Sequence, residues 1–349
     1  MASAISNKTR IWTAPDWHSR YTCDESHCLE IVKLDYASTI PVKGVAVLVP
    51  GFFQNGADFD LIPEQGISFA RYLMKEKGLQ IYFVHVRGIG NSDVVPHSNL
   101  DDIAMDDLPA AFKYVSELEH QKVIVIGHSQ GGITSKAAIS GLDHCGSLDC
   151  FNTATAANRQ KYIRGILSIG ANQSMSTRFH KEILPFMGSM GWFLRSLTSR
   201  FADYVPAREL LTAFPAEKKI AFLKFWSFLY TPAAVSRDAR TAIMENTLDG
   251  SSIGIINQYA DGIHNGGLRN SSGEAYVDAL KNIHVSIAEV AFENDFFSPP
   301  EETYDDTVLK LDPRFRAFFS FPNQAHEDFM MLPHLAPEFS DAIDWLTRK

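Results

Sequence analysis

The hydrophobic positions of the chain fall into short runs separated by longer amphipathic stretches. Runs of about four to eight apolar and β-branched residues are typical of strands buried on both faces of a parallel sheet. A weaker run covers residues 317–321, and alternation at Leu29, Ile31 and Leu34 predicts a half-exposed first strand. The clear runs predict strands at residues 45–49, 81–86, 123–126, 163–169 and 285–292.

Between several of these runs, apolar residues recur at the spacing of one helix face. Three such stretches predict helices at residues 66–77, 106–120 and 132–142. Strands that alternate with helices form a parallel sheet with helices on both faces. The fold class predicted is therefore α/β, with a mostly parallel, doubly wound sheet.

The alternation stops between residues 172 and 282, where helical segments are separated by Gly, Pro and Ser and no convincing strand occurs. A connection of this length between successive strands is unusual unless it has a structure of its own. We expect a helical cap over residues 172–282, inserted before the penultimate strand. The core is then expected to consist of residues 1–171 and 283–349.

Composition and charge narrow the classes of partner. The chain is 45% hydrophobic and 21% charged, with a formal net charge of −9 and no dense Lys/Arg cluster. Phosphate backbones repel such a surface, so nucleic acid is not an expected partner. No stretch reaches the roughly 18 apolar residues of a membrane span, and the N-terminus lacks the apolar run of a signal peptide. We expect a cytoplasmic protein, or a secreted one if a leader has been removed.

The four cysteines form two closely spaced pairs, Cys23/Cys28 and Cys145/Cys150. Reduced thiols fit a cytosolic protein, whereas two short-loop disulfides would indicate export. A zinc site is the third alternative, although two-residue spacings are commoner for that metal. The histidines close enough in sequence to complete such a site are His18, His27 and His144. The sequence leaves the three alternatives open.

Directly after the strand expected at residues 123–126 comes Gly-His-Ser-Gln-Gly, residues 127–131, followed by a helical pattern. This is a G-x-S-x-G motif in the strand, turn and helix context that it requires. A serine on so sharp a turn adopts a strained backbone conformation, and glycines two positions away on either side avoid collisions with it. The motif predicts Ser129 as a nucleophile. The N–H of Gln130, at the helix N-terminus, would face a developing negative charge.

A serine hydroxyl needs a general base, and the base needs an acid that orients it. In this architecture both follow the nucleophile, first Asp and then His, on loops at the carboxyl ends of later strands. We expect Asp295 as the acid, just past residues 285–292, and His326 as the base, after the last strand. Glu293 is the nearest rival acid, but it lies closer to the strand and is expected to point into the sheet. We expect His128 to pack on the turn.

A tetrahedral oxyanion needs a second backbone donor, from the loop after residues 45–49. Phe52 or Phe53 should supply that N–H, with Phe52 preferred, and Gly51 lets the chain turn close to the site. Residues 87–92 (Arg-Gly-Ile-Gly-Asn-Ser) lack the third glycine of a dinucleotide fingerprint and open no helix. We interpret them as a loop beside the pocket.

With these motifs in this order, the chain resembles the α/β-hydrolase superfamily, of the serine esterase and lipase type, over most of its length. The Gly-His-Ser-Gln-Gly motif, the long helical insert and residues 326–329 (His-Glu-Asp-Phe) are similar to acid lipases. Residues 49–56 (Val-Pro-Gly-Phe-Phe-Gln-Asn-Gly) resemble polyhydroxyalkanoate synthases. Those synthases carry cysteine where this chain has Ser129, which argues against polymer synthesis. Acid lipases usually show His-Gly where this chain has Pro50 and Gly51.

The resemblance implies an α/β-hydrolase fold and the hydrolysis of carboxylic esters through an acyl-enzyme. Such chemistry needs no cofactor and no metal ion, and its expected substrate is a small-molecule or lipid ester. An acyltransferase or thioesterase would use the same three side chains with a different acyl donor or acceptor. A non-catalytic binding module of the same fold is a further alternative.

Two segments of the predicted cap, residues 186–194 and 220–230, are rich in large apolar side chains. At helical spacing such residues form either the core of the cap or the lining of an acyl pocket. If they line a pocket, the enzyme should favour medium or long acyl groups over acetate. The substrate contacts expected on this basis, together with one residue of the oxyanion loop, are Phe53, Met187, Trp192, Phe225 and Trp226.

Overall fold

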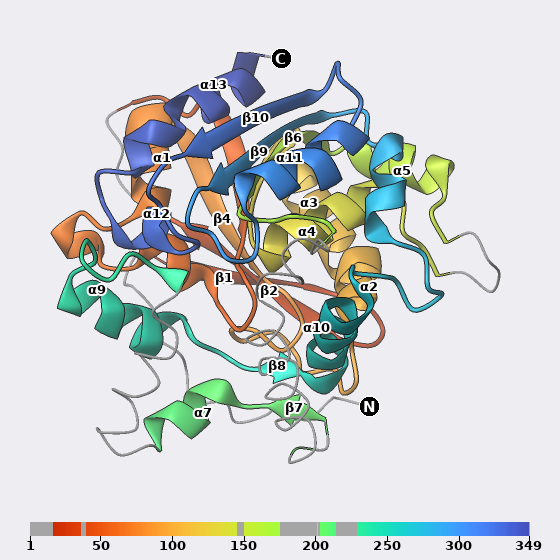
Figure 1. The fold of residues 1–349 in the computed structure, drawn as a ribbon, viewed down its shortest axis with the longest axis horizontal. Coiled ribbons are helices and arrows are strands. Elements are labelled where there is room, and N and C mark those ends of the chain that lie inside the picture. Colours follow the sequence, from red (N-terminus) through yellow and green to blue (C-terminus); the bar gives the residue numbers. More distant parts are fainter. Residues whose placement is uncertain are drawn as a thin grey trace.

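The computed structural model describes residues 17–35, 40–144, 150–174, 201, 203–213 and 229–348. Its main feature is one sheet of eight strands in the order β1-β2-β4-β3-β5-β6-β9-β10 (Figure 1). The strands are β1 (Trp17–Cys23), β2 (Cys28–Leu34), β3 (Gly44–Val49), β4 (Leu79–His85), β5 (Val123–His128), β6 (Ile163–Ile169), β9 (Ser286–Phe292) and β10 (Arg316–Phe321).

The sheet is parallel from β4 to β10, as the alternation of strands and helices predicts. Only β2 runs against its neighbours, since it pairs antiparallel with both β1 and β4. The remaining strands pair in parallel, and β3 aligns Val45 with Val123 of β5. The prediction of a mostly parallel α/β sheet is therefore confirmed.

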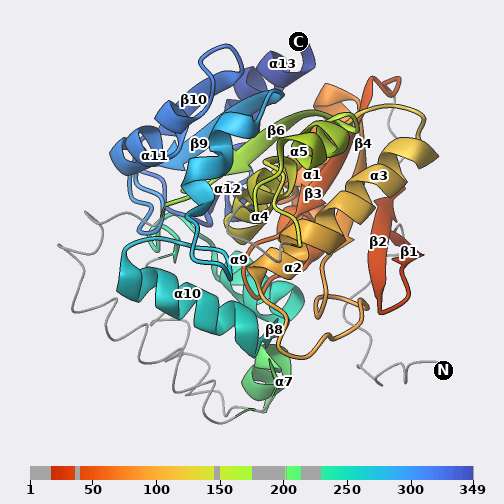
Figure 2. The same ribbon diagram turned by 90° about the vertical axis from the view of Figure 1, so that its right-hand side faces the viewer.

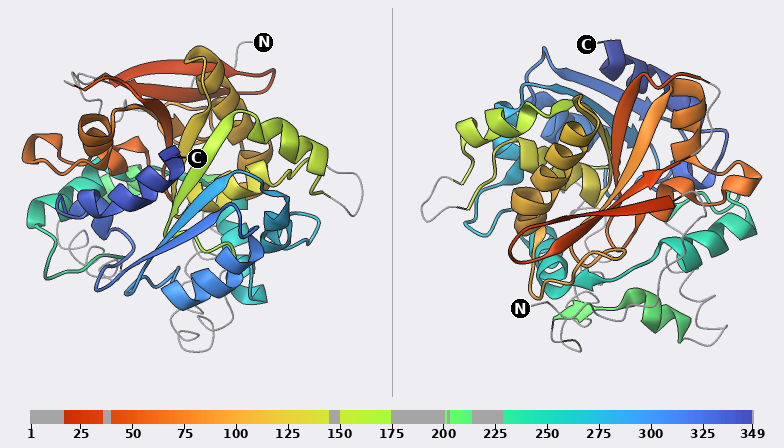
Figure 3. Two further views of the ribbon diagram at one scale, coloured as in Figure 1. Left: turned by 90° about the horizontal axis from the view of Figure 1, so that it is seen from above. Right: turned by 180° about the vertical axis from the view of Figure 1, so that it is seen from behind.

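The inner strands bury both of their faces, because helices cover the sheet on each side (Figures 2 and 3). Alternate residues of β3 show this: Val45 and Val47 pack into one core with α3 and α4, whereas Ala46 and Leu48 pack into the other with α1 and α13. Period-two alternation places successive side chains in different cores, so both must be apolar. The helices outside the insert are α1 (Phe69–Lys77), α2 (Leu100–Asp102), α3 (Leu108–Leu118), α4 (Gln130–Ile139), α5 (Thr153–Gln160), α11 (Pro300–Asp306), α12 (Asp328–Met331) and α13 (Ser340–Arg348).

Shorter helical turns complete the connections. The 3₁₀ turns are η1 (Gly56–Asp60), η2 (Pro63–Gln65), η6 (Tyr276–Asn282), η7 (Val308–Lys310) and η8 (Ala336–Phe339), and the π turns are η3 (Ile103–Asp107) and η5 (Ile243–Thr247). Among the described helices, none is both long enough and apolar enough to cross a membrane.

The strand expected to come first is the second one, and it is not half-exposed. Most of β2 is buried, because β1 covers its outer edge. The polar sequence of β1 gave no periodic signal, since nearly all of its side chains are exposed. Cys23 and Cys28 close the β1–β2 hairpin with a disulfide, S–S 2.02 Å. For this pair the structure selects the disulfide over free thiols or a zinc site.

The insert between β6 and β9 is not free of strands, contrary to the sequence-based expectation. Tyr204 and Val205 of β7 pair antiparallel with Ser252 and Ser251 of β8. A two-residue strand is too short to show alternation, so no pattern could reveal it. Apart from the turns η5 and η6, the described elements of the insert lie in the lower half of the view in Figure 1. They are β7 (Tyr204–Val205), α7 (Ala207–Thr212), α9 (Arg237–Ala242), β8 (Ser251–Ser252) and α10 (Ile253–Asn265).

Candidate active site

Ser129 occupies a sharp turn between β5 and α4. Its backbone has φ 48° and ψ −117°, a region that residues other than glycine rarely adopt, and its N–H donates to Ile169 O at 2.9 Å. A Cβ on Gly131 would lie 2.1 Å from Val49 O, and one on Gly127 would lie 2.5 Å from Gly132 N. Both glycines of the motif are therefore required by close backbone contacts. The turn leaves Ser129 only half-buried, at the start of a helix.

Asp295 and His326 meet although they follow different strands. Asp295 lies just past β9 and His326 lies past β10, and His326 Nδ1 is 2.8 Å from Asp295 Oδ2. The other carboxylate oxygen of Asp295 accepts hydrogen bonds from the N–H groups of Phe297 and Ser298, at 2.8 and 3.1 Å. These contacts fix the carboxylate, which in turn holds the imidazole with Nδ1 protonated and leaves Nε2 as an acceptor.

Ser129 and His326 line the same cavity, which has a volume of about 120 Å³. No direct hydrogen bond joins these two described side chains; such bonds commonly tighten only when substrate is bound. Most of the lining surface is apolar, although six of the lining residues carry polar side chains. The lining residues are Phe52, Gln54, Ser129, Ile133, Gly170, Asn172, Leu229, Tyr259, Ile263, Phe297, Ser298, His326 and Glu327.

The loop after β3 carries the second expected oxyanion donor. Within the described part of the chain, the N–H groups of Phe52 and Gln130 have no hydrogen-bond partner. A Cβ on Gly51 would lie 3.4 Å from Ser129 Cβ, so this glycine lets the loop approach the serine closely. Phe52 lines the cavity and its ring lies 4.9 Å from that of Tyr259. Phe53 has φ 62°, and its ring is tilted by 43° against that of Phe52, with the centroids 4.1 Å apart; it does not line the cavity.

The remaining expected substrate contacts, Met187, Trp192, Phe225 and Trp226, lie outside the described residues. The insert nevertheless reaches the cavity, because Leu229, Tyr259 and Ile263 form part of its wall. Glu293, the rival acid, does not point into the sheet as expected. Its side chain is exposed and accepts a hydrogen bond from Asn323 N at 2.8 Å.

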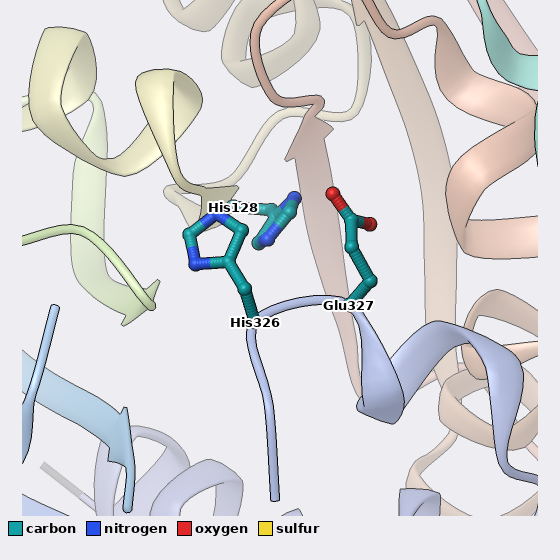
Figure 4. Close-up of side chains that lie close together, drawn as sticks. All are labelled: His128, His326 and Glu327. Atoms are coloured by element: carbon teal, nitrogen blue, oxygen red, sulfur yellow. The ribbon is translucent and has the colours of Figure 1, made fainter. Parts of the chain in front are cut away.

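A second carboxylate lies beside the histidine and was not foreseen from the sequence. His128, His326 and Glu327 are all buried, and their potential ligand atoms lie within 4.8 Å of one another (Figure 4). Nitrogen and carboxylate ligands bind zinc at about 2.0–2.2 Å, so the side chains would have to move together to hold an ion. Glu327 is instead engaged by Gln54, whose Nε2 donates to both carboxylate oxygens at 3.1 Å.

Burial and neighbouring charges set the protonation states in this cluster. Burial alone would lower the pKa of His326, but the charge of Asp295 and its hydrogen bond raise it, and the charge of Glu327 adds to the rise. Burial raises the pKa of Glu327 to about 7, against the opposing influence of His326 and Gln54. Burial and the charge of His326 hold the pKa of His128 well below its usual value. His128 is thus neutral, and it packs on the turn 4.7 Å from the ring of His326.

The loop that carries His326 is anchored to the insert. Glu327 N donates to Leu229 O at 2.7 Å. The Asp328 carboxylate accepts from Thr231 N at 2.7 Å and from Thr231 Oγ1 at 2.5 Å. The backbone on both sides of this contact is therefore fixed, which limits the positions available to the imidazole.

Lys136 and Glu289 form an ion pair with no solvent exposure, in which Lys136 belongs to the helix that follows Ser129. Lys136 Nζ, on α4, donates to both oxygens of Glu289 on β9, at 2.8 and 3.0 Å. It also donates to Ser168 Oγ at 2.9 Å and to Ala171 O at 2.8 Å. The pair thus joins the helix after Ser129 to β9 and to the loop after β6. An apolar run that contains one Glu was the only signal of it in the sequence.

Comparison with known proteins places this geometry in a family. A sequence model described as "Alpha/beta hydrolase family" matches residues 46–345. The chain therefore belongs to the α/β-hydrolase family, as its motifs suggested. No curated protein sequence matches the chain.

Solved structures share the fold at low sequence identity. A thermophilic esterase from Thermogutta terrifontis has a TM-score of 0.59 and 15% identity, covering 95% of this chain and 99% of its own. A monoacylglycerol lipase from Paleococcus ferrophilus has a TM-score of 0.55 and 18% identity, and the match covers 92% of this chain and 98% of the lipase. A proline iminopeptidase from Mycobacterium smegmatis has a TM-score of 0.57 and 12% identity, and the match covers 95% of this chain and 99% of the peptidase. Since these three are named for different reactions, they support the fold and do not single out a substrate.

Proposed function

We propose that the protein is a serine hydrolase that cleaves carboxylic esters through an acyl-enzyme on Ser129. The observation that carries the proposal is the Asp295–His326 hydrogen bond, formed at the wall of the cavity that Ser129 also lines. Acyl transfer requires a serine, an imidazole that can accept its proton and a carboxylate that holds the imidazole; here these are a strained serine at a helix N-terminus, a buried imidazole whose Nε2 has no partner among the described residues, and a fixed carboxylate.

In the proposed reaction, Ser129 Oγ attacks the ester carbonyl carbon and its proton passes to Nε2 of His326. The N–H groups of Phe52 and Gln130 hold the negative oxygen of the tetrahedral intermediate, and Asp295 stabilises the imidazolium. The C–O bond to the alcohol then breaks, and His326 returns the proton to the leaving oxygen. A water molecule then attacks the carbonyl carbon of the acyl-enzyme and gives its proton to His326. The bond to Ser129 Oγ breaks, His326 returns the proton to Oγ, and the acid is released.

The lining of the cavity supports an acyl substrate with an apolar chain. Ile133, Leu229, Ile263 and Phe297 present apolar surface beside the reacting groups. Two of the four belong to residues 172–282, so we propose that this insert acts as the cap that determines acyl specificity. We keep Met187, Trp192, Phe225 and Trp226 as proposed substrate contacts; Phe53 stays a proposed contact only for a substrate that extends beyond the cavity, which it does not line.

The test of the reaction is the Ser129→Ala variant. Loss of the nucleophile should leave the fold intact and reduce hydrolysis of p-nitrophenyl esters by several orders of magnitude, about 10⁶-fold if the three side chains act as a unit. A fluorophosphonate probe should label the parent protein at Ser129 and not label the variant. The proposal is wrong if the purified variant hydrolyses these esters like its parent.

The same assay separates hydrolysis from acyl transfer. With an added alcohol as acceptor, a hydrolase should release mainly the free acid, because water reaches the acyl-enzyme. A new ester as the main product would replace the proposal with an acyltransferase that uses the same residues. Thioester substrates, run in parallel, test the thioesterase alternative.

A further inference from the structure

Within the proposed hydrolase, on which this inference rests, we infer that Glu327 is a positioning residue that serves the imidazole of His326 as a second carboxylate beside Asp295. Asp295 holds one ring nitrogen by a hydrogen bond, whereas Glu327 acts through its charge across a short gap. The described residues thus supply two negative groups to the one cation that the reaction creates.

The geometry places the carboxylate of Glu327 close to the ring of His326, with no hydrogen bond between these two described side chains. One potential ligand atom of Glu327 lies within 4.8 Å of one ring nitrogen of His326 and of one ring nitrogen of His128, and Figure 4 shows the carboxylate on the side of the two rings, with His128 between it and His326 in that view. His326 and Glu327 are 3% and 5% exposed, so little water screens the interaction. Gln54 Nε2 donates to both oxygens of the Glu327 carboxylate and so holds the side chain in place. The backbone N–H of Glu327 donates to Leu229 O, which fixes the backbone at this residue.

Several titratable groups surround Glu327 and determine when it is charged. Asp58 on η1, Asp295 past β9 and Asp328 on α12 disfavour its ionisation, whereas His326 and the Gln54 amide favour it. His128, on β5, is held neutral by burial and by His326, so it contributes a dipole and no charge. Asp58 is fully buried, and its pKa is raised by burial and by the charge of Glu327. The two carboxyl groups therefore compete for ionisation, and Glu327, with a hydrogen-bond donor and a cation beside it, is the one we expect to ionise.

The consequence for the reaction follows from Coulomb's law. An opposite charge about 4–6 Å away moves a pKa by about 1–3 units toward the charged form. Glu327 therefore favours the imidazolium of His326, the species formed as Ser129 attacks. Because the pKa of Glu327 is raised to about 7, the carboxyl is mostly neutral in acid and becomes ionised as the pH rises. Its stabilisation of the imidazolium therefore grows with pH. The two groups titrate as a coupled pair, so the acid limb of the pH profile belongs to both.

Glu327→Gln is the variant that removes the charge and keeps the size. The direct measurement is the NMR titration of ¹³C-labelled histidine, with the His326 signal assigned by comparison with His326→Gln. We expect the parent signal to titrate in a broad, two-step curve. In Glu327→Gln it should become a single step whose pKa is about one unit lower.

Glu293→Gln is the matched control. It makes the same chemical change on the loop past β9, at an exposed carboxylate. Its His326 titration should coincide with that of the parent. An unchanged His326 titration in Glu327→Gln would overturn the inference, since a purely structural role for Glu327 predicts no shift of the midpoint.

Kinetics provide a second readout through the rate at which a fluorophosphonate labels Ser129. In Glu327→Gln the acid limb should move about one unit to lower pH, and the plateau rate should fall about tenfold, the factor that corresponds to one pKa unit. Glu327→Asp, which keeps a carboxylate, should return the acid limb toward that of the parent. If Glu327→Gln does not fold, Glu327→Asp and the two-step titration of the parent still decide the question; a one-step parent curve would count against the inference.

The two proposals fail differently. If the parent protein is not labelled at any pH, the hydrolase proposal fails, while the NMR titration still reports whether Glu327 raises the pKa of His326. If the parent is labelled and its acid limb coincides with that of Glu327→Gln, the hydrolase stands and the role of Glu327 is lost.

Discussion

At the scale of single residues, the site depends on positions where one residue type is the only one that fits. Ser129 keeps a strained backbone because the contacts of Gly127 and Gly131 leave no room for a side chain on either side of it. Gly170 has φ 57°. A Cβ at this position would lie 3.1 Å from both Asp295 Oδ2 and His326 Nδ1, so the absence of a side chain lets the backbone pass close to both groups. A motif of such residues can be recognised in sequence because the constraint is local.

Asp295→Asn is the prediction that belongs to this scale. The amide should keep the size of the side chain but hold the imidazole in the wrong tautomer, so turnover should fall by about 10⁴-fold with little loss of stability. Initial rates of ester hydrolysis, with circular dichroism as a check of folding, measure the effect. Glu293→Gln should retain parental rates; if instead it loses activity and Asp295→Asn does not, the assignment of the acid is reversed.

The sequence could indicate Ser129, Asp295 and His326 as the proposed nucleophile, acid and base, because each follows a strand that an apolar run marks, although the run before His326 is weaker. It could not reveal Glu327 or Gln54, since their meeting depends on how the loop after β3 packs against the loop after β10. No periodicity encodes a contact between residues 273 positions apart. The same holds for the neutral state of His128, which follows from burial against Phe329 and His326.

At the scale of elements, α4 is tied to the sheet by charge as well as by apolar packing. Lys136 reaches from the helix to Glu289 of β9, and burial lowers the pKa of the lysine and raises that of the glutamate. Each charge compensates the cost of burying the other. Removing only one of the two partners therefore leaves an unpaired buried charge and destabilises the fold. The pair also fixes Ala171 O, next to the residues that line the cavity.

Lys136→Met should therefore destabilise the protein more than the double variant Lys136→Met, Glu289→Leu. Removal of the lysine alone leaves a buried carboxylate and should cost about 3–5 kcal/mol of unfolding free energy, whereas replacing both groups leaves no unpaired charge. Urea unfolding of the parent, both single variants and the double variant gives the coupling energy. Additive losses, with no coupling, would show that the two groups do not stabilise each other.

The strands that the sequence marked most clearly are those buried on both faces of the sheet. Strands β3, β5, β6 and β9 differ from their expected bounds by at most a few residues, because apolar runs mark them. β1 has almost no buried side chain, and β7 and β8 have two residues each. Such elements are held by backbone pairing to a neighbour, which leaves no mark on composition.

At the scale of the whole molecule, the insert and the core share the cavity. Helix α10 contributes Tyr259 and Ile263 to the wall of the cavity, and the core contributes Phe52 and Ile133. The family match and the shared fold cover both parts of the chain but do not determine what the cavity accepts. The size of that wall should set the acyl preference.

Ile263→Trp should shift hydrolysis toward short acyl chains. The larger ring would fill part of the cavity, so kcat/KM for octanoate esters should fall at least tenfold relative to acetate esters, about 1.4 kcal/mol of discrimination. A profile of p-nitrophenyl esters from acetate to dodecanoate measures it. Leu309→Trp, at a side chain that is 47% exposed, is the control. Equal profiles for both variants would place the acyl chain elsewhere.

The order of the strands has a consequence for how the chain is synthesised. β6 lies inside the sheet between β5 and β9, yet β9 is separated from it by the whole insert. While a ribosome produces that insert, the backbone groups along the outer edge of β6 have no partner in the sheet, and an unpaired apolar edge is a site for aggregation. Neither the acid nor the base has yet emerged at that stage. The nascent molecule thus holds Ser129 in an incomplete sheet, and the proposed activity can arise only after β9 has paired with that edge and β10 has paired with β9.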